Sequence, residues 1–243
     1  MDAATYAAEA QIEATHWWFT GRRRLFAREI AELGIGDDAR ILDIGTSTGT
    51  NLRMLRDLGY RSVTGLDFSP DAIRHCEDKG LGPVRQGDIC ALPFADSSFD
   101  LVLATDIIEH VDDDSRALSE IARVLAPDGA VLITVPTFPS LWGLQDRVAQ
   151  HKRRYRLRPL VRKIEGVGLA VASRYYFNYI LFAPIWAARR VIDIFRIALK
   201  SEGDVNNPIL NSVLKAVFAF DIATARVLRP PFGVSALVIA RRS

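Results

Sequence analysis

The chain has 243 residues, and its 49% apolar and 25% charged residues are typical of a soluble globular protein. The formal net charge is only +2, so the composition gives no sign of a nucleic-acid-binding protein. The two cysteines, Cys76 and Cys90, do not resemble the disulfide framework of a small secreted domain, which favours a reduced, cytoplasmic setting. No basic stretch followed by an apolar core opens the chain, and no uncharged apolar run reaches the ~18 residues of a membrane span. We therefore expect neither a signal peptide nor a transmembrane helix.

The N-terminal part of the chain, residues 1–33, has a helical pattern with an aromatic interruption at residues 16–19. Thr20 is a possible N-cap for a helix over residues 21–33, and the glycines at positions 34 and 36 end it. We interpret residues 1–36 as a helical lid.

From residue 37 to residue 136, short apolar runs alternate with helical patterns. We expect strands at residues 40–44, 62–66, 83–85, 99–104 and 130–135, and helices after residue 50, at 71–79 and at 115–125. This alternation predicts βαβ units and a parallel sheet with both faces buried.

After Pro136 the pattern changes. We expect a basic loop over residues 137–157, a short helix at 159–166, a strand at 170–177, a helical insertion or cap over residues 178–230 and a last strand at 234–240. The sequence shows no internal repeat, so we interpret the whole chain as one α/β domain.

The expected first strand leads into Asp43-x-Gly45-x-Ser47-x-Gly49, directly before a helical pattern. Glycines at such a turn let the backbone approach a ligand closely, and free N–H groups at the helix start favour a negatively charged group. A dinucleotide-binding loop needs glycine at positions 45, 47 and 50, but Ser47 and Thr50 occupy two of them. A plain strand–turn–helix connection is the alternative.

Two further carboxylates follow the next two expected strands. Asp67 ends the second strand, where a carboxylate accepts hydrogen bonds from both hydroxyls of a ribose, and Asp88 follows the third, within reach of an adenine amino group. A single loop aspartate is common, but three at the ends of consecutive strands indicate a nucleoside-binding edge.

These motifs together resemble those of class I S-adenosylmethionine-dependent methyltransferases, of the small-molecule, methyltransferase-11-like type. The resemblance is carried by Ile41–Gly45, Gly65–Ser69, Gly87–Phe94, Ser98–Val102 and Arg123–Gly129, and is close over about residues 38–136. It implies a Rossmann-like seven-stranded sheet with helices on both faces, an antiparallel last strand and S-adenosyl-L-methionine as cofactor.

The resemblance also implies roles for single residues. The loop residues Asp43, Gly45, Thr46 and Gly49 would hold the methionine part of the cofactor, and Thr105 would lie at its reactive end. Asp67 would bind its ribose. Phe68 would contact the face of the adenine, and Asp88 and the backbone of Ile89 would bind the adenine edge. Ser47 is a departure, since many members have glycine there.

The segment after the fourth expected strand, residues 105–111, lies beside the reactive methyl group in this family. His110 is therefore a candidate catalytic base, although methyl transfer depends mainly on alignment and on exclusion of water. The alternative is that Glu109-His110 is a structural feature of the family.

Aromatic and basic residues are clustered near the N-terminus. By resemblance to a subgroup of these enzymes, Trp18 and Arg22 are candidates for covering the cofactor and binding its carboxylate, and His16 and Trp17 for contacting the substrate. Alternatively, the tryptophans pack a helix onto the sheet and the arginines face water; the sequence does not decide between Arg22, Arg23 and Arg24.

The densest basic run is residues 151–156. It is either a solvated surface or a lid that binds an acidic substrate, with His151, Arg154 and Tyr155 as candidate contacts. The near-neutral net charge argues against nucleic acid, and we assign no metal ligand from the sequence.

The insertion at residues 178–230 contains two apolar helical patterns. Arg189, Asp193, Arg196 and Lys200 share one narrow face of the first. Three interpretations are open: the helices cover an apolar substrate, form a homodimer interface, or lie on the inner face of a membrane. We favour methyl transfer to a small-molecule or lipid-linked, amphiphilic acceptor over a non-catalytic cofactor-binding or scaffolding protein, or a nucleotide-dependent oxidoreductase.

Overall fold

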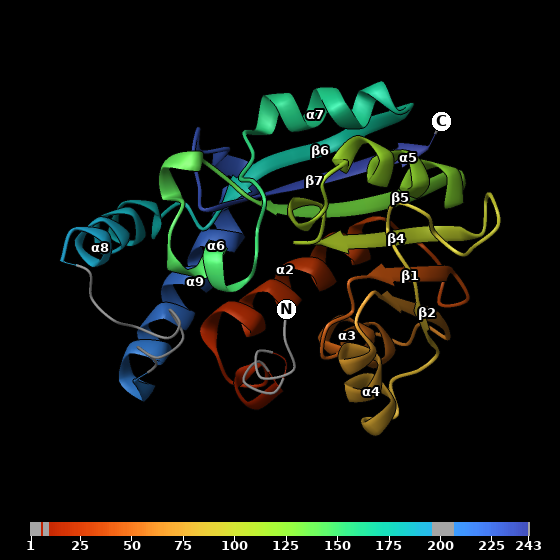
Figure 1. The fold of residues 1–243 in the computed structure, drawn as a ribbon, viewed down its shortest axis with the longest axis horizontal. Helices are drawn as coiled ribbons and strands as arrows, with labels where there is room; N and C mark the ends of the chain where they lie inside the picture. Colours follow the sequence, from red (N-terminus) through yellow and green to blue (C-terminus); the bar gives the residue numbers. More distant parts are fainter. Residues whose placement is uncertain (1–5, 7–9, 196–206, 243) are drawn as a thin grey trace.

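A computed structural model describes Tyr6, residues 10–195 and residues 207–242 (Figure 1). Its centre is a seven-stranded sheet with the order β3-β2-β1-β4-β5-β7-β6. The strands are β1 (Arg40–Ile44), β2 (Ser62–Asp67), β3 (Val84–Gln86), β4 (Phe99–Thr105), β5 (Leu125–Pro136), β6 (Leu169–Phe177) and β7 (Ser235–Arg242). Strand β7 runs antiparallel to both neighbours, and the pairs among β1 to β5 are parallel. The expected Rossmann-like methyltransferase sheet with an antiparallel last strand is confirmed.

Helices cover both faces of this sheet (Figure 1). They are α2 (Trp17–Glu32), α3 (Thr50–Asp57), α4 (Pro70–Asp78), α5 (Asp114–Val124), α6 (Leu144–Val148), α7 (Leu157–Gly166), α8 (Phe182–Phe195) and α9 (Pro208–Leu228), with 3-10 turns η1 (Ile108–His110) and η2 (Pro139–Leu141). Helices α5 and α7 pack on one face, and α2, α3, α4 and α9 pack on the other.

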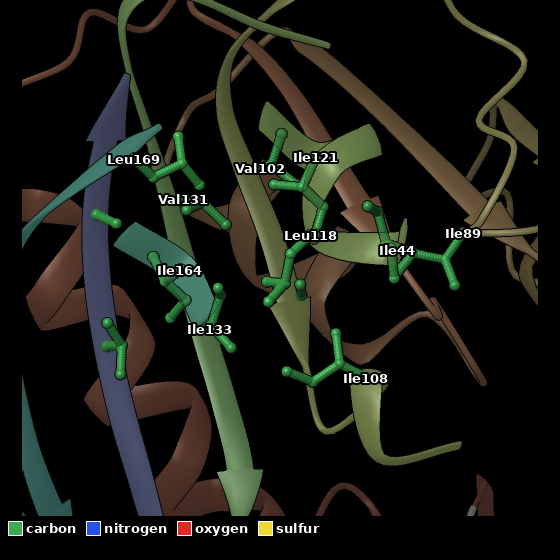
Figure 2. Close-up of a cluster of buried hydrophobic side chains, with 14 of the residues drawn as sticks. Ile44, Ile89, Val102, Ile108, Leu118, Ile121, Val131, Ile133, Ile164 and Leu169 are labelled. Carbon is green, nitrogen blue, oxygen red and sulfur yellow. The ribbon is translucent and has the colours of Figure 1, made fainter. Parts of the chain in front are cut away.

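Alternating strand residues build the two cores. On β4, Val102 faces the α5 and α7 side, whereas Leu101 and Leu103 face the α2 and α9 side. Figure 2 shows Val102 among side chains of β5, α5 and α7 in the first of these cores. Because both faces are buried, the central strands are continuous apolar runs instead of alternating ones.

The start of the first long helix differs from the expectation. Helix α2 begins at Trp17 with His16 as its N-cap, and the chain turns at residues 13–15, so Thr20 is not the N-cap. The aromatic residues that suggested an interruption lie inside the helix. Trp18 packs against Phe218 of α9 with ring centroids 5.4 Å apart. This tertiary packing favours a longer helix than the local sequence pattern indicates.

The segment expected to be a basic loop, residues 137–157, is more ordered than predicted. It contains η2 and α6, and Thr137 forms a β-bridge with Tyr155. In the insertion, the polar face expected on the first helix begins with Arg189, which is buried. Of the other residues on this face, Arg196 and Lys200 lie outside the described residues.

Candidate functional site

A cavity of about 1660 Å³ opens at the carboxyl ends of the central parallel strands. Sites for one drug-sized ligand typically measure about 300–1,000 Å³, so this cavity has room for a nucleoside cofactor and a second molecule. Its lining comes from the β1–α3 loop, the ends of β2 and β4, η1, the start of α2, and helices α6, α8 and α9. In Figure 1 the arrowheads of β1, β4 and β5 point toward the end of the sheet where α6 and α8 lie.

The β1–α3 loop forms one wall. Gly45, Ser47 and Gly49 all have positive φ, at 74°, 49° and 85°. A Cβ on Gly45 would lie 2.8 Å from the side chain of Ile107, so this position requires glycine for space as well as for conformation. Ser47 adopts a positive φ, a conformation that glycine adopts more easily than serine.

Asp67 at the end of β2 holds this loop. Its Oδ2 accepts a hydrogen bond from the N–H of Ser47, and its Oδ1 accepts one from the N–H of Ser69, each at 2.9 Å. Burial raises the pKa of the Asp67 carboxyl, and the backbone hydrogen bonds partly oppose that rise. A carboxylate oxygen has two lone-pair directions, so both oxygens retain capacity to accept from ribose hydroxyls at the cavity surface.

The expected adenine contacts also line the cavity. Phe68 is 74% exposed there, so the face of its ring is accessible. Asp88 accepts a hydrogen bond from the N–H of Cys90 at 2.8 Å, which fixes its carboxylate after β3. Ile89 lines the cavity and is otherwise buried in the core.

Asp43 is not at the cavity surface, in contrast to the other acidic residues of the motifs. It is fully buried, and its Oδ1 accepts a hydrogen bond from the amide of Asn51 at 2.9 Å. The same amide donates to the hydroxyl of Thr105 at 3.0 Å. Asn51 lines the cavity and joins β1, α3 and β4, a role that the sequence analysis missed. Its position as a polar residue in the first turn of α3, directly after the loop, is the sequence feature that could have indicated this role.

The N-terminal candidates also reach the cavity. His16, Trp17, Trp18 and Arg22 all contribute to its lining. The Arg22 guanidinium lies between the rings of Trp18 and Phe26, at 5.4 and 5.1 Å from their centroids, and forms an ion pair with Asp106 at 2.6 Å. Trp17 and Trp18 thus pack against Phe218 of α9 and also border the cavity, and Arg22 is paired instead of facing water. The contacts of this cluster with cofactor and substrate stay predictions. Arg23 instead donates to the backbone oxygen of Glu13 at 2.8 Å.

The two histidines expected at the site lie together. The rings of His110 and His151 are 4.8 Å apart in an edge-to-face arrangement. Burial lowers the pKa of His110 to about 4, so its imidazole is neutral at pH 7. His151 is oriented by Asp146, whose Oδ1 lies 2.9 Å from its Nδ1. The adjacent Glu109 is fully buried, which raises its pKa well above the usual range. The sequence analysis missed Asp146 as part of this cluster.

Three cations of the basic run pair with carboxylates of this chain, the Lys152 pair at the exposed surface and the Arg154 pair in the interior. Lys152, Arg153 and Arg154 form ion pairs with Asp112, Asp114 and Asp146, respectively. Arg154 borders the cavity, but its guanidinium is buried and also donates to the carbonyl of Thr137.

Tyr155 was a candidate substrate contact, but the structure places it outside the cavity. Its side chain is buried in the core, and its hydroxyl lies within hydrogen-bond distance of the carbonyl of Ile108, at 3.1 Å, and of the carboxylate of Asp114, at 3.0 Å. It is not among the residues that line the cavity. The charges of this run therefore build the wall instead of forming a free basic surface.

The cavity fits the expected cofactor at several points. It presents a backbone loop with positive φ angles, the Asp67 carboxylate, an accessible aromatic face and the Asp88 carboxylate, in the spatial order of methionine, ribose and adenine contacts. The fold and this site define a class: an open α/β protein with a nucleoside site at the carboxyl edge of its sheet.

Comparison with known proteins identifies the family. Residues 42–133 match the family model described as a methyltransferase domain. Together with the fold, this match shows that residues 42–133 form a class I methyltransferase domain, whose cofactor is S-adenosyl-L-methionine.

The chain is 37% identical over 120 residues to phosphatidylethanolamine N-methyltransferase of Cereibacter sphaeroides, covering 46% of this chain and 55% of that protein. It is 31% identical over 128 residues to demethylmenaquinone methyltransferase of Renibacterium salmoninarum, covering 49% and 51%. The chain thus spans about half the length of these curated relatives. A solved S-adenosylmethionine-dependent methyltransferase from Archaeoglobus fulgidus matches with a TM-score of 0.56 and 22% identity over 90% of this chain and 94% of that chain, and supports the fold.

Proposed function

We propose that this protein transfers the methyl group of S-adenosyl-L-methionine to an amphiphilic acceptor, such as a lipid-linked molecule. The observation that carries the proposal is the construction of the cavity. Its cofactor end is polar and built from the β1–α3 loop and Asp67, whereas its opposite wall is apolar and built from α8 and α9. An amphiphilic acceptor fits this cavity, with its polar group at the reacting end and its apolar chain along the wall of α8 and α9.

The apolar wall is made of aliphatic side chains. Ile185 and Ile192 contribute from α8, Leu210 and Leu214 contribute from α9, and Leu181 contributes from the segment before α8. Each buried CH₂ group of an acceptor contributes about 0.8 kcal/mol, so a long chain adds substantial affinity. The names of the two relatives above refer to a phospholipid and to a menaquinone precursor, which supports an acceptor of this class.

Radiolabelled S-adenosyl-L-methionine tests this proposal. The protein is incubated with the lipid fraction and, separately, with the water-soluble fraction of a cell extract. We expect label in the lipid fraction. Label only in water-soluble products would contradict the amphiphilic acceptor. Label in neither fraction, with S-adenosylhomocysteine still bound in calorimetry, would favour the non-catalytic cofactor-binding alternative.

The outer faces of α8 and α9 lead us to propose contact with a membrane surface. On α9, Ile209, Val213, Phe220 and Val227 follow one another at steps of four, seven and seven and form one exposed stripe, with Phe220 61% and Val227 82% exposed. On α8, Ile194 is 71% exposed. Exposed apolar area of this extent is rare on a protein without a partner.

Helix α9 is long and apolar enough to cross a membrane by length and composition, although it carries Lys215 and Asp221 and 22% of it is buried. Its inner face packs on α2 and β6. We therefore propose that α9 lies on the membrane instead of spanning it, with Arg190 and Lys215 near anionic head groups, at the inner face of the membrane. Leu210 is both 40% exposed and part of the cavity lining, so the membrane-facing surface continues into the acceptor site.

Co-sedimentation with anionic vesicles tests this contact. We expect binding that weakens about tenfold in Phe220→Ser, because burial of one large apolar side chain contributes about 1.5–3 kcal/mol. Leu58→Ser is the matched control, since Leu58 is 47% exposed at the C-cap of α3 and is not part of the stripe. A stable dimer that binds no vesicles would contradict the membrane contact and assign the stripe to an interface between two copies.

A further inference from the structure

Three side chains with metal-ligating atoms converge on one wall of the cavity. Glu109 and His110 belong to η1 after β4, and His151 belongs to the segment after α6. One ligand atom of each lies within 4.8 Å of the ligand atoms of the other two. All three residues line the cavity. Two imidazoles and one carboxylate are a ligand set of divalent transition-metal sites that keep positions open for water or substrate.

Glu109 has the environment of a ligand without its ion. Its side chain is fully buried, and neither carboxylate oxygen has a hydrogen-bond partner among the described residues. The Nε2 of His151 lies 4.0 Å from Glu109 Oε1, which is too long for a hydrogen bond. A buried carboxyl group whose two oxygens lack a partner is costly, and a cation bound at the cavity wall would satisfy them.

His151 is held in the orientation that metal binding requires. Its Nδ1 contacts Asp146 Oδ1 at 2.9 Å, which favours the tautomer with the proton on Nδ1 and the lone pair on Nε2. Asp146 is itself fixed by the Nε of Arg154 at 2.7 Å and by the N–H of Gly143 at 2.8 Å. Nε2 of His151 thus lies 4.0 Å from Glu109 Oε1, a separation that one cation bound to both atoms would bridge.

We propose that Glu109, His110 and His151 bind one divalent transition-metal cation, such as Zn²⁺ or Mn²⁺, with Asp146 orienting His151. Ligand atoms at about 2.0–2.2 Å from one ion lie about 3–3.5 Å apart, so the donors must approach by about 1 Å, within the range of side-chain rotation. The sequence analysis assigned no metal ligand, because His151 is far from the other two in the chain.

A cation at this wall would activate the methyl acceptor, a role that rests on the proposed methyl transfer. A cation held there by Glu109, His110 and His151 would lower the pKa of an acceptor hydroxyl at this wall. In the methyl transfer, the acceptor atom forms a bond to the methyl carbon while the carbon–sulfur bond breaks, and the sulfur keeps the electron pair as S-adenosylhomocysteine leaves.

Titration of chelator-treated protein with Co²⁺ tests the site through the visible absorption of the bound ion, and calorimetry with Zn²⁺ gives the stoichiometry. We expect one ion per chain. Glu109→Gln and His151→Ala should each weaken binding at least about tenfold, and Asp146→Asn should weaken it about 10- to 100-fold through the orientation of His151. His75→Ala is the matched control, because His75 lies on α4 outside the cluster.

Circular dichroism and the affinity for S-adenosylhomocysteine establish that each variant is folded. Absence of a bound ion in the unmodified protein, or equal binding by Glu109→Gln and His151→Ala, would overturn the assignment. Because the readout is the ion itself, failure to find a methyl acceptor would not affect this test.

Discussion

Asp67 illustrates how one side chain serves both the fold and the site. Its two oxygens already hold the N–H groups of Ser47 and Ser69, so it fixes the loop that faces the cofactor. Any ribose contact is added to these two hydrogen bonds. A change at this residue therefore affects loop geometry and ligand contact together.

We predict that Asp67→Asn weakens S-adenosylhomocysteine binding at least tenfold. The amide keeps only one acceptor oxygen, and hydrogen bonds to a charged group contribute about 1.5–3 kcal/mol. Calorimetry measures the affinity. Asp57→Asn is the control, since Asp57 is exposed at the end of α3. An unchanged affinity in Asp67→Asn would remove this residue from the cofactor site.

Asp43 gives a prediction about pH. Burial, the largest cause, raises the pKa of its carboxyl to about 7, above the ordinary 3.8. Between these values the folded protein binds more protons at this residue than the unfolded chain does, so its contribution makes stability fall as pH rises from about 4 to 7. Urea unfolding at pH 5, 6 and 7 should show a smaller decrease in Asp43→Asn than in the unmodified protein. Equal slopes would contradict the raised pKa.

Local sequence patterns predict the cofactor residues better than the acceptor side. Gly45, Asp67 and Asp88 follow directly from strands, so their position along the chain fixes their position in space. Glu109 and His151 meet only through tertiary structure, and the internal pairing of Arg154 with Asp146 depends on folding that no short motif encodes. The basic run therefore suggested a ligand surface, although its charges are paired internally.

At the scale of whole elements, α8 shows why an amphipathic pattern does not by itself give orientation. The pattern places Arg189 on a narrow polar face, which suggests a side in contact with water. In the structure Arg189 is buried, with its guanidinium 3.7 Å from Asp146, while Trp186, Val191 and Ile194 are exposed. The buried Asp146 carboxylate attracts Arg189 inward, so Trp186, Val191 and Ile194 are left on the outside of the helix.

The packing of α2 on α9 gives a prediction at this scale. A Cβ on Gly21 would lie 2.2 Å from Cδ1 of Phe218, so the two helices approach each other only because residue 21 has no side chain. We predict that Gly21→Ala destabilises the protein by about 1–3 kcal/mol through overpacking, despite the higher helix propensity of alanine.

Urea unfolding measures this effect. Gly166→Ala is the control, because its Cβ would meet nothing within 4 Å at the end of α7, and it should leave stability unchanged or raise it slightly. A neutral Gly21→Ala would show that the α2–α9 contact adjusts without cost.

At the scale of the whole molecule, the N-terminal segment joins the carboxyl edge of the sheet to the apolar helix α9. Glu13 accepts hydrogen bonds from Lys79, the C-cap residue of α4, at 2.8 Å, and from Thr48 of the β1–α3 loop. Asn211 of α9 accepts from the N–H of Trp17 at 2.8 Å and donates to the carbonyl of Thr15 at 3.0 Å. The segment between Glu13 and Trp17 therefore connects the cofactor loop to the helix proposed to face the membrane.

This connection predicts an effect over distance. Glu13→Ala removes the carboxylate that ties the N-terminal segment to Thr48 and Lys79, and so loosens the cover of the cavity that Ile12 and His16 provide. Loss of such a partly buried pair should weaken S-adenosylhomocysteine binding by about 1 kcal/mol, roughly fivefold, mainly through faster dissociation. Stopped-flow tryptophan fluorescence measures the dissociation rate, with Glu165→Ala on the exposed surface of α7 as control. An unchanged rate in Glu13→Ala would show that the segment packs on the loop without holding the cofactor, and the cavity would then be closed chiefly by α8 and α9.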